Sequence, residues 1–60
     1  MLFQFDLHDA NTARKMLDRC ADDMGRALDQ HEQIEVLDNL TDWSFGYIRM
    51  LVDHINATVH

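Results

Sequence analysis

The feature that most constrains this chain is its near lack of residues that break a helix. None of its 60 residues is proline, and only Gly25 and Gly46 are glycine. Because these two residue types are the strongest local breaks in a helical pattern, little interrupts helix after the first few residues. No internal repeat or linker is visible. The sequence therefore predicts an all-α fold in a single small domain, residues 1–60.

The first half carries an ordinary one-sided helical pattern. Its apolar residues recur every three or four positions and are mostly small or flexible: Ala10, Ala13, Leu17, Cys20, Ala21, Met24, Ala27 and Leu28. This spacing places them on one face of a helix. Asp9 comes just before the pattern, and aspartate is a favoured N-cap. We expect a first helix at about residues 10–29.

The second half is also helical in pattern, with one candidate break. Asp29 and Glu32 have the spacing of a capping box, which predicts a helix start there. Further on, Thr41 can cap a helix, and Leu40 and Phe45 sit at the positions of a hydrophobic staple. The pattern leaves two helices or three open. We favour an antiparallel helical hairpin of residues 10–29 and 32–57, kinked or interrupted at 39–41.

A short alternating segment precedes the first helix. Phe3, Phe5 and Leu7 fall on one side of it, and period two with aromatic residues is typical of extended chain. We expect an N-terminal arm that lies over the helices or pairs with a second copy.

Size favours self-association. A chain this short hides only about 60% of its unfolded surface, so its core supplies only a few kcal/mol of net stability. Cys20 is the only cysteine, so no disulfide can form within the chain, and no ligand pattern suggests a structural zinc. By elimination we expect a homodimer, formed from two hairpins as a four-helix bundle.

The strongest functional signal lies in residues 41–55, which hold the only tryptophan and the only tyrosine. If residues 34–57 are one helix, or two that are nearly collinear, their apolar residues cover an arc of roughly 220° around the helix axis. The first helix can cover about half of that arc, so the remainder predicts an interface. If the helix breaks, the two pieces rotate and part of the excess is buried within the monomer.

We therefore predict a surface that binds a second protein carrying an apolar groove with a basic rim. Its apolar members are Trp43, Phe45, Tyr47 and Met50, and its acidic rim is Glu32, Glu35, Asp38 and Asp42. The rim would steer and orient a basic partner. A regulator, an adaptor or an inhibitor acting by steric binding fits this pattern.

Composition makes other functions less favourable. A net charge of −6 disfavours direct binding to nucleic-acid phosphates. Two alternatives remain: a bundle that grips RNA with the basic residues of the first helix, and an acidic mimic of nucleic acid. Those basic residues are Arg14, Lys15, Arg19 and Arg26. No stretch is long enough to cross a bilayer and no signal peptide is evident, so a cytoplasmic location is expected.

No catalytic motif is present, and we expect neither an enzyme nor a cofactor. In a hairpin, His8, His54 and the terminal His60 fall at one end, but their spacing matches no metal-ligand motif. Cys20 lies in the apolar seam and is expected to be a buried thiol. Gly46 lies inside a helical pattern, either because another backbone or ring approaches it or because a weak point is tolerated.

Overall fold

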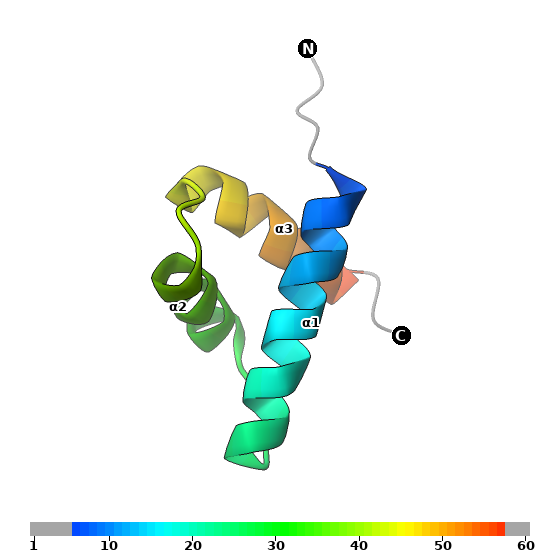
Figure 1. Ribbon diagram of the computed structural model, residues 1–60, viewed down its shortest axis with the longest axis vertical. Helices are drawn as coiled ribbons and strands as arrows, with labels where there is room; N and C mark the ends of the chain where they lie inside the picture. Colours follow the sequence, from blue (N-terminus) through cyan, green and yellow to red (C-terminus); the bar gives the residue numbers. More distant parts are fainter. Residues whose placement is uncertain (1–5, 58–60) are drawn as a thin grey trace.

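The computed structural model describes residues 6–57, and within that range it contains three α-helices and no strand. The helices are α1 (Leu7–Met24), α2 (Gln30–Leu40) and α3 (Phe45–Ala57) (Figure 1). The expected all-α fold is confirmed. The favoured hairpin is replaced by three helices: the candidate break at 39–41 falls next to the observed one, because residues 41–44 separate two helices within 32–57.

The start of α1 lies earlier than the sequence pattern suggested. The N-cap is Asp6, whose extended backbone lets its carboxylate accept the His8 N–H at 2.9 Å. Asp9 instead lies within the first helical turn, where a negative charge favours the helix dipole. Leu7 is therefore helical and is not part of an extended arm. Phe3 and Phe5 lie outside the described residues.

The end of α1 is also earlier than expected, at Met24 instead of residue 29. Gly25 follows it with φ 72°, a left-handed conformation that glycine adopts without a steric penalty. Two backbone hydrogen bonds close the C-terminus of α1. The Gly25 N–H donates to Asp22 O and the Arg26 N–H donates to Ala21 O, each at 3.2 Å. This is a Schellman motif, and the chain beyond it cannot continue the helix.

The capping box at the start of α2 is confirmed. The Asp29 carboxylate accepts the Glu32 N–H at 2.8 Å, and the Glu32 carboxylate accepts the Asp29 N–H at 3.1 Å. At the other end, the Thr41 hydroxyl donates to Leu37 O at 2.7 Å, so Thr41 closes α2 and does not cap α3. Ser44 caps α3, since its hydroxyl oxygen accepts the Tyr47 N–H at 3.3 Å.

The core is centred on α3, which supplies half of the buried side chains. The buried residues are Ile48, Leu51, Val52 and Ile55 from α3, Ala10, Ala13 and Leu17 from α1, and Leu37 from α2. In Figure 1, α3 passes behind α1, and α2 packs beside both. Small residues on α1 allow this close approach, and each buried aliphatic side chain contributes about 1.5–3 kcal/mol.

Five of the eight residues of the predicted apolar face of the first helix are less buried than expected. Cys20, Ala21 and Leu28 are half-buried, and Met24 and Ala27 are exposed, Ala27 because it lies beyond the end of α1. Within residues 6–57, none of the three helices combines the length and apolar character required to cross a membrane.

Candidate functional site

The break between α2 and α3 turns part of the predicted aromatic face inward. Trp43 is half-buried and packs against the core, with its ring edge-on to Tyr47 at a centroid distance of 5.8 Å. Its backbone N–H is held by the Thr41 hydroxyl at 3.3 Å. This is the outcome expected for a broken helix, and it reduces the apolar surface left for a partner.

Tyr47 is also engaged within the chain. Its hydroxyl donates to the Asp9 carboxylate at 2.5 Å and accepts the Asp6 N–H at 3.2 Å, which ties α3 to the start of α1. The hydrogen bond to the Asp9 carboxylate raises the pKa of Tyr47. The hydroxyl therefore stays protonated and keeps donating at neutral pH.

Two large apolar side chains remain on the outside of the break. Leu40, the last residue of α2, is 60% exposed, and Phe45, the first residue of α3, is 59% exposed. Met50, the fourth predicted apolar contact, is half-buried. Of the predicted apolar set, Phe45 is thus the exposed member.

A groove lies between α2 and α3 beside Phe45. Its volume is about 280 Å³, and its lining residues are His31, Ile34, Glu35 and Asp38 from α2 with Phe45 and Arg49 from α3. The positions on α2 follow the i, i+3, i+4, i+7 spacing of one helix face. The groove combines apolar walls with a rim of opposite charges.

The predicted acidic rim divides into two groups. Glu32 is held by the Arg26 guanidinium through two hydrogen bonds, one of them at 2.8 Å, in addition to its role in the capping box. These contacts, the Arg26 hydrogen bond first, lower the pKa of Glu32 to about 2. Its charge is therefore already paired within the chain. Glu35 and Asp38 line the groove, whereas Asp42 is exposed on the loop before α3.

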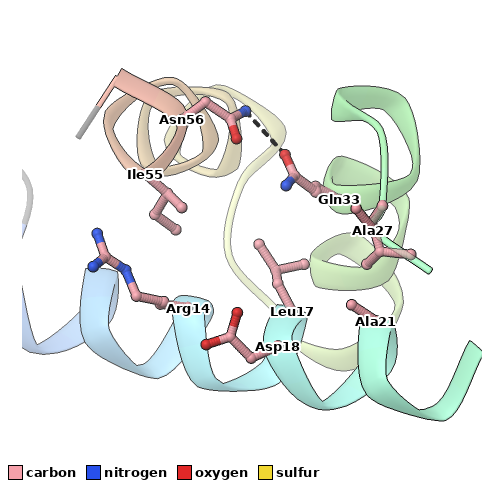
Figure 2. Close-up of a pocket in the computed structure, with 9 residues that line it drawn as sticks. Arg14, Leu17, Asp18, Ala21, Ala27, Gln33, Ile55 and Asn56 are labelled. Carbon is pink, nitrogen blue, oxygen red and sulfur yellow. Dashed lines mark hydrogen bonds between the residues drawn. The ribbon is translucent and has the colours of Figure 1, made fainter. Parts of the chain in front are cut away.

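A larger cavity, of about 550 Å³, opens at the other end of α2, where it faces α1 (Figure 2). Leu17 and Ile55 point into it from α1 and α3, and Arg14 and Asp18 stand on its α1 wall. It is lined by Arg14, Leu17, Asp18, Ala21, Ala27, Leu28, Gln33, Ile55 and Asn56. A hydrogen bond of 2.9 Å from the Asn56 amide to the Gln33 amide oxygen joins α3 to α2 beside it. Small side chains such as Ala21 and Ala27 leave this corner loosely filled.

The residues considered for RNA binding and for metal binding do not form one cluster in the described part of the chain. The four basic residues named for RNA binding are exposed on or just beyond α1, and Arg26 among them is engaged with Glu32. No group of three or more potential metal ligands is found among residues 6–57, and His60 lies outside them. Within residues 6–57, nothing lies within 4 Å of where a Cβ at Gly46 would stand, so no backbone or ring from that part of the chain approaches it.

Comparison with known proteins adds no assignment. No protein-family model, curated protein or solved structure matches this chain. A functional proposal for this chain must therefore be based on the geometry of the molecule itself.

Sequence reasoning missed three members of the groove: His31, Ile34 and Arg49. It treated residues 34–57 as nearly collinear, and on one continuous helix Ile34 and Arg49 do not face each other. The available signal was Ser44, which lies two positions after the exposed Asp42 and can cap a new helix as well as Thr41 can. When the helix begins at residue 45, the face of α2 that carries Ile34 and the face of α3 that carries Arg49 line the same groove.

Proposed function

We propose that this chain is a small protein-interaction module, and that it acts as a regulator, adaptor or inhibitor by sterically occupying a surface of a partner protein. One observation carries the proposal. Phe45 is 59% exposed at the mouth of a groove whose other walls hold Ile34, Glu35 and Asp38. An exposed aromatic ring beside a concave, partly apolar surface is a typical anchor for protein binding.

The proposed surface is smaller than the one suggested by the sequence. We define the docking surface as Leu40, Phe45 and the groove residues Ile34, Glu35 and Asp38. Trp43 and Tyr47 act as its support, because they pack or hydrogen-bond within the chain. Asp42 is exposed in the loop, two positions after Leu40 in sequence.

The test compares two exposed apolar residues at different places. Phe45→Ala removes the anchor, and Met24→Ala removes a 52% exposed side chain at the far end of α1. Each purified variant is incubated with lysate of the native host, and bound proteins are quantified by mass spectrometry. A partner of the docking surface is retained by the wild type and by Met24→Ala and is lost from Phe45→Ala. Circular dichroism should remain helical for all three.

If every protein retained by the wild type is retained equally by Phe45→Ala, the docking surface is not the binding site. Loss of helical signal in Phe45→Ala would contradict the proposal too, because it would make Phe45 part of the fold.

We also propose that the chain self-associates, on the ground of its small core. Light scattering tests this directly, since a dimer has twice the 7.0 kDa mass of the chain. The four-helix bundle expected from two hairpins requires revision, because each chain supplies three helices.

A further inference from the structure

We infer that the groove between α2 and α3 takes a cationic side chain, arginine or lysine, from a partner protein, with an apolar neighbour of that side chain resting on Phe45. This inference rests on the proposed function and specifies what the docking surface recognises. Its basis is the size, the walls and the charge of the groove.

The groove is small and open, so it does not enclose a ligand. Its volume of about 280 Å³ lies below the roughly 300–1,000 Å³ of typical ligand pockets. It is also open to solvent, with the Glu35 side chain 68% exposed and that of His31 87% exposed. One long side chain entering from a second protein matches this size.

The walls suit a side chain with an apolar stem. Ile34 is half-buried on the α2 side, and the Phe45 ring stands 59% exposed on the α3 side. Arginine and lysine bury their methylene stems along such surfaces while their charged ends stay in water. An aromatic face also attracts a cation directly.

The charge of the rim selects a cation over an anion. Glu35 and Asp38 are one helical turn apart on α2 and face the groove together. Against these two carboxylates stands one guanidinium, Arg49, which leaves a net charge of −1 when His31 is neutral. Since Arg26 holds Glu32, the carboxylates of Glu35 and Asp38 are the pair that the groove itself presents.

Arg49 opposes the incoming cation. It lines the same groove from α3, so its positive charge repels the arginine or lysine of a partner there. Removal of the Arg49 charge should therefore strengthen binding, a direction that a purely structural role would not produce.

A second copy of this chain is a poor occupant of the groove. In an isologous contact the groove would meet its own copy, so its net charge of −1 would stand on both sides of the contact. Like net charges oppose association at this face. The charge pattern favours a basic partner segment.

The test selects binders from a displayed library of randomised helical peptides against the whole 60-residue chain. Peptides that bind the wild type and lose binding to Phe45→Ala are groove ligands. We expect these to share an arginine or lysine within one helical turn of a large apolar residue. Their affinities are then measured by fluorescence anisotropy.

Two charge variants decide the inference. Glu35→Gln with Asp38→Asn should weaken groove peptides by roughly three- to tenfold, as for two exposed charge pairs. Arg49→Gln should strengthen them. The matched control, Asp22→Asn with Asp23→Asn on α1, removes the same charge away from the groove and should have a smaller effect.

Groove peptides that lack a basic residue, or that weaken equally in the control, would overturn the inference and leave the proposed function standing. If no selected peptide is sensitive to Phe45→Ala, both are wrong.

Discussion

The two corners of this molecule differ in what they leave exposed. At the first corner, residues 25–29 join α1 to α2, and the Arg26 and Asp29 side chains both have partners within the chain. Gly25 closes α1, Asp29 opens α2, and Arg26 reaches across to Glu32. At the second corner, residues 41–44 join α2 to α3 and leave Leu40 and Phe45 exposed on either side.

The difference separates residues that make the fold from residues that remain available. The first corner has one large exposed apolar side chain beside it, Met24, while its Arg26 side chain is paired with Glu32. The second corner keeps two, Leu40 and Phe45, largely in water, where they add little to stability, and we propose that another molecule contacts them. The second corner is connected to the core through Trp43 alone among its loop residues.

The largest expected effect tests this connection. Trp43→Ala should lower the free energy of unfolding by about 2–3 kcal/mol, somewhat less than for a fully buried ring. Phe45→Ala should change it by less than about 0.5 kcal/mol, as is usual for an exposed residue. Urea denaturation followed by circular dichroism measures both.

Trp43→Phe provides the control, because it keeps a ring in the same place and should recover most of the loss. Equal destabilisation by Trp43→Ala and Phe45→Ala would remove the distinction between support and docking surface at the second corner.

A smaller effect compares the caps of the two corners. Asp29→Ala removes the carboxylate that accepts the Glu32 N–H at 2.8 Å and should cost about 1 kcal/mol. Ser44→Ala removes a longer bond, of 3.3 Å, and should cost about half as much. For a domain this small, about 1 kcal/mol corresponds to roughly 4–8 °C in Tm, so thermal unfolding resolves the two. A greater loss in Ser44→Ala would contradict the view that the first corner is the better fixed.

The first corner was largely readable from sequence, and the second was not. The spacing of Asp29 and Glu32 correctly predicted the capping box of α2, because a capping box depends on residues that are close together in the chain, although α2 begins at Gln30 and not at residue 32. Even there, the end of α1 was placed at residue 29, since the apolar spacing of Ala27 and Leu28 continued past Gly25. A left-handed glycine ends a helix even where the apolar pattern continues beyond it.

The groove could not be read in the same way, because it depends on how two helices meet after a break. Thr41 and Ser44 can both cap a helix. Which of them does so decides where α3 begins, and therefore on which side Phe45 and Arg49 lie relative to Ile34 of α2. The partner of Tyr47 was equally hidden: Asp9 is 38 positions away in sequence, and only the packing of α3 against α1 brings their side chains together.

The smallest expected effect is a pH dependence confined to the first corner. The Arg26 hydrogen bond holds the pKa of Glu32 at about 2, below its ordinary value of 4.5. The stabilisation linked to this lowered pKa is complete above about pH 4.5 and is lost as the pH falls toward 2. Urea unfolding of the wild type and Glu32→Gln across that window measures it: the difference in unfolding free energy should shrink steadily with acid. Glu35→Gln is the matched control at the second corner, where its difference from the wild type should change less. Because both carboxylates lie on α2, a parallel decline in the two variants would mean that the general charge of the helix, and not the Arg26 contact, stabilises the first corner.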